Sequence, residues 1–256
     1  MTVPPHIDYP PKPEAVYLFG TCLVDLFYPA AGLAAVELIE REGVRVIYPQ
    51  GQTCCGQPPF NSGYREEART VAAAQMALFP KPIPVVVPSG SCGAMMRVHY
   101  PHLFEGAGET EATARAFAGR VFEWSEFMVH VLGVRLRDRG APVKATYHPS
   151  CHLLRELKVG QPPLDLLGQL DRVELLPLAD AMECCGFGGT FSVKFDEISG
   201  AMVEDKRRNI VDTGAEVLIS ADSGCLMNIG GALAKAGAGI AVKPLPLFLK
   251  ERVDGA

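Results

Sequence analysis

Cysteine is the residue of this chain whose number and spacing most directly suggest chemistry. The eight cysteines fall into two sets of four, each built as a single cysteine, a Cys-Cys-Gly triplet and another single cysteine. The gaps are 31 and 36 residues in the first set and 32 and 39 in the second, and matching cysteines are offset by 129, 130, 130 and 133 residues. This offset of about half the chain indicates an internal duplication. The sets are Cys22, Cys54, Cys55 and Cys92, and Cys151, Cys184, Cys185 and Cys225.

Four thiolates are the usual ligands of a cubane iron–sulfur cluster and also of a structural zinc ion. Zinc sites use Cys-x2-4-Cys pairs, and no Cys-x-x-Cys occurs here. Adjacent cysteines reach two irons of one cluster more easily than they chelate one ion, and Gly56 and Gly186 let the backbone approach cluster sulfides. We therefore predict that all eight cysteines are metal ligands, with one iron–sulfur cluster, of 4Fe-4S type, in each repeat. Zinc and disulfides remain alternatives.

Two histidines lie beside the first cysteine of the second set. His148 and His152 flank Cys151. Either could ligate iron, as in Rieske centres, or donate a hydrogen bond to cluster sulfur. Because four cysteines already satisfy a cubane, we expect both histidines to surround the cluster without ligating it.

Short apolar runs precede the cysteine groups and predict strands, and longer segments with helical periodicity lie between them. This alternation predicts an α/β fold of two similar lobes related by duplication. Each lobe should hold a small, mainly parallel sheet flanked by helices, with its cysteines at the carboxyl ends of the strands. The expected strands are 15–19, 44–48, 85–87, 143–147, 172–176 and 216–219. The expected helices are 23–42, 61–79, 113–132, 192–213 and 226–236.

The predicted domain limits follow from the duplication. Residues 1–13 contain five prolines and are expected to form a flexible N-terminal tail. The first repeat should cover 14–134, including helix 113–132, whose apolar stripe around Trp124 should pack in the core or between the lobes. A polar linker, 135–141, then leads to the second repeat, 142–252.

Composition narrows the function classes. The chain is 48% hydrophobic and 21% charged, with a net charge of −5 and a pI of about 5.7, which argues against nucleic acid as a partner. No segment reaches the ~18 apolar residues of a membrane span, and the proline-containing N-terminus does not resemble a signal peptide. We predict a cytoplasmic protein, a location that disfavours disulfides. Neither G-x-G-x-x-G after a strand nor G-x-x-x-x-G-K-[ST] occurs, so no flavin or NAD is expected on this chain.

These motifs resemble the duplicated cysteine-rich (CCG) domain proteins, which include a cysteine-rich subunit of heterodisulfide reductase and the glycolate oxidase iron–sulfur subunit. The similarity is greatest to the lactate utilisation protein A type. It is carried by residues 51–58 (GQTCCGQP), 147–151 (YHPSC) and 184–194 (CCGFGGTFSVK), and it extends from about Tyr17 to about Leu249. The resemblance implies an iron–sulfur electron-transfer subunit of a multisubunit complex that oxidises a 2-hydroxy acid, L-lactate in particular. Such a subunit is not expected to be active without partner chains.

The chain departs from the longer family pattern once in each repeat. Heterodisulfide reductase subunits end each repeat in Cys-x-x-Cys, whereas Ser89 and Asp222 stand where the first cysteine of that motif would be. The resemblance therefore does not extend to the five-cysteine clusters of that relative. We expect both side chains to face the cluster pocket and to cap the helices that begin there, with ligation of cluster iron by the hydroxyl or carboxylate as the alternative.

The resemblance also implies partners, because the ferredoxin motif C-x2-C-x2-C-x3-C-P of many glycolate oxidase relatives is absent. A separate ferredoxin-type iron–sulfur subunit, and a flavin-containing dehydrogenase subunit if a flavin is used, should therefore assemble with this chain. Two alternative functions remain. One is a heterodisulfide reductase-like catalyst of thiol/disulfide exchange, and the other is an interaction module held together by zinc or a cluster, without a redox role.

Overall fold

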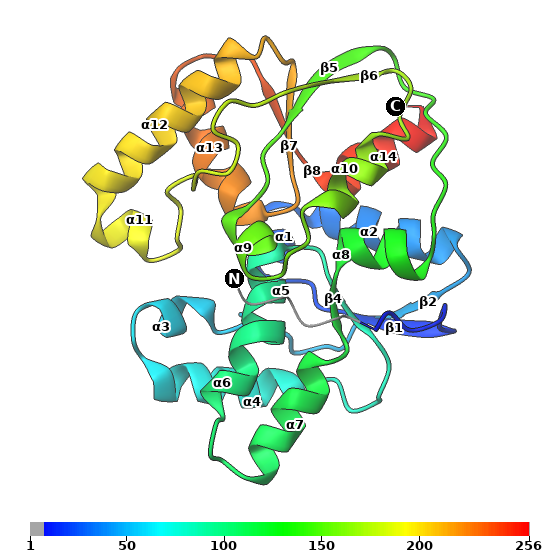
Figure 1. The fold of residues 1–256 in the computed structure, drawn as a ribbon, viewed down its shortest axis with the longest axis vertical. Helices are drawn as coiled ribbons and strands as arrows, with labels where there is room; N and C mark the ends of the chain where they lie inside the picture. Colours follow the sequence, from blue (N-terminus) through cyan, green and yellow to red (C-terminus); the bar gives the residue numbers. More distant parts are fainter. Residues whose placement is uncertain (1–7, 256) are drawn as a thin grey trace.

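The computed structural model describes residues 8–255, which form two lobes, each with a four-stranded sheet (Figure 1). Both sheets are entirely parallel, with strand orders β2-β1-β3-β4 and β6-β5-β7-β8. The two orders are the same once the numbering is shifted by four, so the predicted two-lobe α/β fold is confirmed. The strands are β1 (Ala15–Leu18), β2 (Arg45–Ile47), β3 (Val85–Val87), β4 (Val121–Glu123), β5 (Val143–Tyr147), β6 (Val173–Leu176), β7 (Val217–Ser220) and β8 (Ala241–Pro244).

Helices connect the strands and cover the sheets, as parallel pairing requires. In the first lobe they are α1 (Cys22–Phe27), α2 (Pro29–Arg41), α3 (Gln57–Asn61), α4 (Arg65–Ala77), α5 (Gly90–Ala94), α6 (Tyr100–Leu103), α7 (Glu109–Ala118) and α8 (Trp124–Glu126), with π-helical turns η1 (Met95–His99) and η2 (Phe127–Val131). In the second lobe they are α9 (Cys151–Arg155), α10 (Gln161–Leu167), α11 (Phe191–Lys194), α12 (Asp196–Asp212), α13 (Ser223–Lys235) and α14 (Leu245–Asp254). None of the helices in residues 8–255 has the length and apolar character needed to cross a bilayer.

The prediction of one helix over 113–132 is wrong. Helix α7 ends at Ala118, and strand β4 then pairs with β3 in the register Val86 with Phe122 before α8 begins. The apolar stripe is buried as expected, with Trp124 only 1% exposed. Its spacing fits a helix, but pairing of 121–123 with β3 satisfies the backbone groups on one side of this edge strand, and all three of its residues are buried.

Two other predicted helices are each divided. Segment 23–42 is split at Tyr28, because Pro29 begins α2 and cannot continue the ladder of α1. Segment 192–213 is split at Phe195, and two of its large apolar side chains are exposed, at 52% for Phe195 and 56% for Ile198. Strand β8 and helices α3, α6, α9, α10 and α14 were not predicted.

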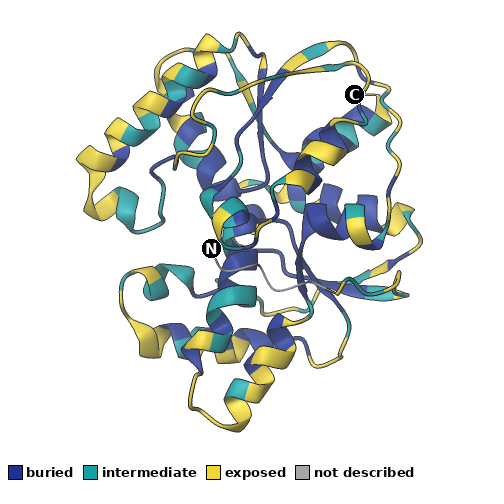
Figure 2. Cartoon of the chain, in the orientation of Figure 1, coloured by how far each residue is buried: buried dark blue, intermediate teal, exposed yellow. Residues whose placement is uncertain are grey.

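One hydrophobic core is shared by the lobes. It joins residues of β1 and α2 to residues of β5, β7 and α14, and helix α14 lies against α2 (Figure 1). Trp124 belongs to this core and donates its indole N–H to the carbonyl of Ala35. The buried residues in Figure 2 run without a break from one lobe to the other. The two repeats therefore fold against each other.

Of the proposed N-terminal tail, only 8–13 lies within the described residues. Tyr9 stacks on His130, with ring centroids 4.5 Å apart, and its hydroxyl donates to Glu126. This part of the tail thus contacts the first lobe.

Candidate metal centre

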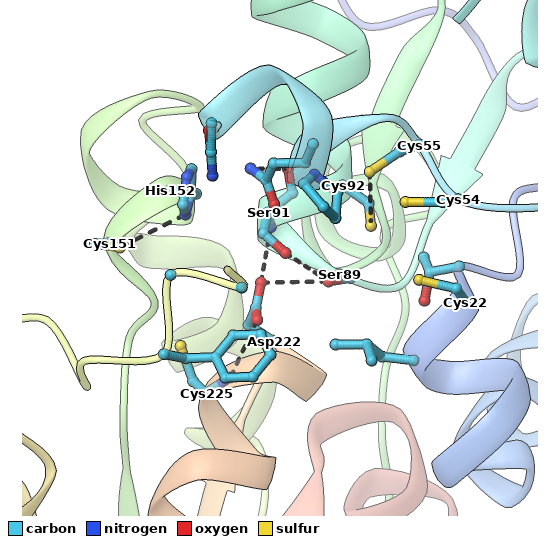
Figure 3. A pocket seen from close by; sticks show the side chains of 18 of the residues that line it. Cys22, Cys54, Cys55, Ser89, Ser91, Cys92, Cys151, His152, Asp222 and Cys225 are labelled. Atoms are coloured by element: carbon cyan, nitrogen blue, oxygen red, sulfur yellow. Dashed lines mark hydrogen bonds between the residues drawn. The ribbon is translucent and has the colours of Figure 1, made fainter. Parts of the chain in front are cut away.

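All eight cysteines are free thiols, and all eight line one cavity of about 210 Å³. Ser89, Ser91, His152 and Asp222 contribute to the same lining. In Figure 3, Cys22, Cys54, Cys55 and Cys92 lie on one side of the cavity, and Cys151 and Cys225 lie on the other. The duplication thus brings both cysteine sets to a single space between the lobes.

The strand ends explain this convergence. Cys22 opens α1 after β1, and Cys92 lies in α5 after β3. Cys151 opens α9 after β5, and Cys225 lies in α13 after β7. The carboxyl ends of parallel strands meet at one edge of a sheet, so the cysteines at these ends come together as predicted.

The lobes meet at this same edge through their short helices. Helix α5 of the first lobe packs on α9 of the second, and α1 packs on α13 in the corresponding arrangement. At Gly90 the approach is so close that an added Cβ would lie 2.9 Å from both Leu153 Cβ and Ser150 Oγ. Gly90 N–H also donates to the carbonyl of Ala221 across the lobes. This contact between the lobes places the two cysteine sets opposite each other.

Within each set the first thiol of the adjacent cysteine pair is the one whose pKa is lowered. Hydrogen bonds from the Cys22 and Cys55 thiols lower the pKa of Cys54, and those from Cys151 and Cys185 lower the pKa of Cys184. The amide of the glycine after each pair adds a further hydrogen bond, with 3.4 Å between nitrogen and sulfur at both Gly56 and Gly186. Thiolate is the form that binds metal, so these hydrogen bonds favour the ligating form of one sulfur in each set.

The second cysteine of each pair is held through its backbone. Tyr100 Oη donates to the Cys55 carbonyl at 2.8 Å, and Asn228 Nδ2 donates to the Cys185 carbonyl at the same distance. The Cys55 and Cys92 sulfurs lie 3.4 Å apart. Both lobes thus orient their cysteine loop from a helix. These two side chains were missed from the sequence, because they come from helical turns beyond Cys92 and Cys225 and only the packing brings them back to the loops.

Asp222 links the two cysteine sets. One carboxylate oxygen accepts hydrogen bonds from the amides of Gly224 and Cys225, so Asp222 caps α13 as predicted. The other oxygen accepts from Ser91 N at 2.8 Å and Ser89 Oγ at 3.3 Å, both in the first lobe. Ser89 does not cap α5, so that prediction is wrong. Its hydroxyl is directed to the buried carboxylate, which needs hydrogen-bond donors.

The two predicted histidines differ in their surroundings. His152 lies at the cavity, with Nδ1 3.6 Å from the Cys151 sulfur, and its other nitrogen is 3.7 Å from Glu156. His148 is completely buried, and neither of its ring nitrogens has a hydrogen-bond partner among the described residues. Burial, together with the positive charge of Lys206, lowers the pKa of His148 to about 4. A nitrogen of His148 and the sulfurs of Cys185 and Cys225 all lie within 4.8 Å of one another.

Two further polar residues hold the loops that carry the cysteine pairs. Gln75, from α4, bonds both the amide and the hydroxyl of Thr53. Lys206, from α12, donates to the Asp180 carbonyl at 2.5 Å. Both side chains are buried, at 2% exposure. Each is a polar residue on an otherwise packed helix face, a signal that could have been noticed in the sequence but was not.

The donor set fits a metal–sulfur cluster. Eight unpaired thiols, two of them with lowered pKa, share one cavity, and an imidazole without a partner among residues 8–255 lies beside the second set. Buried polar groups without partners are rare in proteins, so the His148 nitrogens indicate that a group is to be bound there.

Comparison with known proteins identifies the family of both repeats. Residues 16–97 and 145–230 each match the family CCG, described as a cysteine-rich domain. The chain belongs to the CCG cysteine-rich domain family. Each match contains one Cys-Cys-Gly triplet and all four cysteines of one set.

Full-length relatives of the CCG protein are also known. It is 48% identical over 239 residues to "Lactate utilization protein A" of Geobacillus kaustophilus, covering 93% of this chain and 99% of the relative. It is 48% identical over 245 residues to the protein of the same name from an Exiguobacterium species, covering 94% and 99%. A crystal structure of a hypothetical protein from Helicobacter pylori aligns with a TM-score of 0.69 at 12% identity. That alignment covers 98% of this chain and 52% of the other, and it shows the shared fold alone.

Proposed function

We propose that this CCG protein is an iron–sulfur electron-transfer subunit of a multisubunit complex that oxidises L-lactate or a related 2-hydroxy acid. The observation that carries the proposal is the convergence of two four-cysteine sets on one cavity between the lobes. The relatives named for lactate utilisation support the substrate. A bound cluster would supply one-electron transfer, with potentials set by its ligands and hydrogen bonds.

In this proposal each lobe holds one cluster, of 4Fe-4S type. Cys22, Cys54, Cys55 and Cys92 would bind the first, and Cys151, Cys184, Cys185 and Cys225 the second. Hydrogen bonds from neighbouring thiols, and also from the amides of Gly56 and Gly186, lower the pKa of one sulfur in each set and so favour its thiolate form. Asp222 holds the lobes in register across the two sets through Ser89 and Ser91.

Oxidation of the hydroxy acid itself is assigned to a partner chain. Among the described residues that line the cavity there is no lysine or arginine. The carboxylate of a 2-hydroxy acid is usually held by such a side chain. A flavin-containing dehydrogenase subunit would therefore act on substrate, while this chain and a ferredoxin-type iron–sulfur subunit conduct the electrons in the cytoplasm.

Metal analysis of anaerobically prepared protein tests the metal assignment. We expect iron and acid-labile sulfide in equal amounts, with about half of each lost in Cys54→Ala and about half in Cys184→Ala. An exposed methionine gives a matched control, since Met182→Ala removes no thiol and should keep all the iron. Stoichiometric zinc without labile sulfide would instead support the interaction module held by zinc.

Gene disruption tests the substrate. Loss of growth on L-lactate, restored by the wild-type gene but not by the Cys54→Ala gene, is the expected result. Normal growth on lactate, with growth lost on another substrate, would refute the assignment.

A thiol/disulfide catalyst is the second candidate, because both cysteine sets open into the same cavity, where a disulfide could lie between them. Reduction of a disulfide by the iron-loaded protein with a low-potential electron donor would favour this candidate. Absence of turnover in the presence of intact clusters would exclude it.

A further inference from the structure

The two lobes differ at one buried position behind their cysteines. Phe19 follows β1 and His148 follows β5, and each lies three residues before the first cysteine of its set. Both are completely buried. Their backbone positions also match, since Phe19 N–H donates to the Val86 carbonyl and His148 N–H to the Ile219 carbonyl, in the neighbouring strands. The duplication thus places a hydrocarbon ring in one lobe where the other has an imidazole.

The imidazole lies against the second cysteine set. Its ligand nitrogen and the sulfurs of Cys185 and Cys225 are within 4.8 Å of one another, and all three residues are buried. The backbone bond to Ile219 fixes the His148 backbone at the end of the sheet, and the side chain is completely buried there. Neither ring nitrogen has a partner among the described residues. Leaving such a group unsatisfied is costly, and a sulfur acceptor would offset that cost.

The imidazole can donate a hydrogen bond whatever its protonation state. A neutral ring has one N–H and one bare nitrogen, and a charged ring has two N–H groups. The four cysteines of the second set complete the ligands of a cubane without it. Iron therefore needs no nitrogen ligand from His148, and its N–H can donate a hydrogen bond to a sulfur atom.

Resting on the proposed function, we propose that His148 donates an N–H hydrogen bond to a sulfur of the second iron–sulfur centre and thereby sets its reduction potential apart from that of the first. Hydrogen bonds to cluster sulfur stabilise the more negative, reduced state and raise the potential. The side chain of Phe19 has no N–H and cannot do this at the first centre. In this proposal His148 acts through a hydrogen bond and does not ligate iron, so the four cysteine ligands stay unchanged.

Two other charged groups lie near the second set. Lys206 is the counterpart of the neutral Gln75 in the first lobe, since both hold a cysteine loop from the helix that follows it. Asp222 carries negative charge near Cys225, but four hydrogen-bond donors surround its carboxylate. Substitution of His148 alone leaves both groups in place and isolates the effect of the imidazole.

The test is a redox titration of the iron-loaded protein followed by electron paramagnetic resonance, with 15N-labelled histidine for nitrogen hyperfine spectroscopy. In His148→Phe we expect unchanged iron, a lower potential for one centre only, and loss of the weak nitrogen coupling that comes from His148, as distinct from any coupling of His152 beside Cys151. The exposed His102 provides the control variant His102→Gln, which should keep both potentials and the coupling. His148→Gln retains an N–H donor and should shift the potential less than phenylalanine.

The results that would contradict the inference can be distinguished from those that would contradict the proposed function. Full iron content with both potentials unchanged in His148→Phe would overturn the inference and leave the proposed function intact. Loss of about half of the iron from both folded His148 variants would also overturn it, since that result would make His148 a direct ligand. Wild-type protein that binds no iron would overturn the proposed function and the inference with it.

Discussion

The glycine after each cysteine pair offers a comparison between repeats. Gly56 and Gly186 have nearly equal φ values, 87° and 83°, in the left-handed region. Their surroundings differ, because a Cβ on Gly56 would meet nothing closer than 3.5 Å, whereas one on Gly186 would lie 2.8 Å from the Ser199 carbonyl oxygen and 3.0 Å from Met202 Cβ. We therefore predict that alanine is tolerated better after the first cysteine pair than after the second.

The expected magnitudes follow from two contributions. The left-handed backbone alone costs an alanine about 1–2 kcal/mol relative to glycine. At position 186, overpacking against backbone adds about 1–3 kcal/mol. Ser199 Oγ also donates to the Gly186 carbonyl at 2.8 Å, so the loop cannot easily move away from α12. Gly186→Ala should thus lower the free energy of unfolding by about 2–5 kcal/mol and Gly56→Ala by about 1–2 kcal/mol.

The assay is urea unfolding of the metal-free, reduced protein, followed by circular dichroism and by fluorescence of Trp124, the single tryptophan. Gly43→Ala isolates the backbone contribution, because Gly43 has φ 75° and no atom within 4 Å of an added Cβ. It should match Gly56→Ala. Equal destabilisation by Gly56→Ala and Gly186→Ala, at unchanged m-value, would show that the close contact at Ser199 does not resist the extra methyl group.

Three further predictions concern buried polar groups. Burial raises the pKa of Glu123 from 4.5 to about 7, so its contribution to stability is complete below pH 4.5 and is lost as the pH rises through 7. Glu123→Gln should remove this loss, which is up to about 3 kcal/mol, and parallel pH–stability curves for both proteins would contradict it. Asp222→Ala should destabilise the protein by about 2–3 kcal/mol in urea unfolding, because four donors lose their acceptor. Asp222→Asn should cost less stability, because asparagine can still cap α13, and equal costs for the two variants would refute the capping role. Tyr100→Phe removes the hydrogen bond to the Cys55 carbonyl and should lower the free energy of unfolding by about 1 kcal/mol. It should also speed iron release to a chelator from one centre only, and equally fast release from both centres would argue against this role of Tyr100.

The sites of disagreement between sequence and structure share a physical cause. The apolar spacing around Trp124 suits a helix, yet β4 forms there because β3 offers an unpaired, buried edge. Likewise, the hydroxyl of Ser89 is at a capping position, yet the carboxylate of Asp222 from the other lobe attracts it. In both cases a partner distant in sequence outweighs a local preference.

By itself, the sequence determined the duplication, the parallel α/β lobes and the placement of cysteines at strand ends, because these depend on local periodicity and on a repeat offset that can be counted directly. Only the tertiary structure decided that both cysteine sets face one cavity and that Asp222 joins them. It also separated His148, buried against Cys185 and Cys225, from His152 at the cavity. The two histidines are four residues apart and equivalent by composition. The sheet directs one inward and helix α9 directs the other to the cavity, and only the packing of one lobe on the other determines which sulfurs each meets.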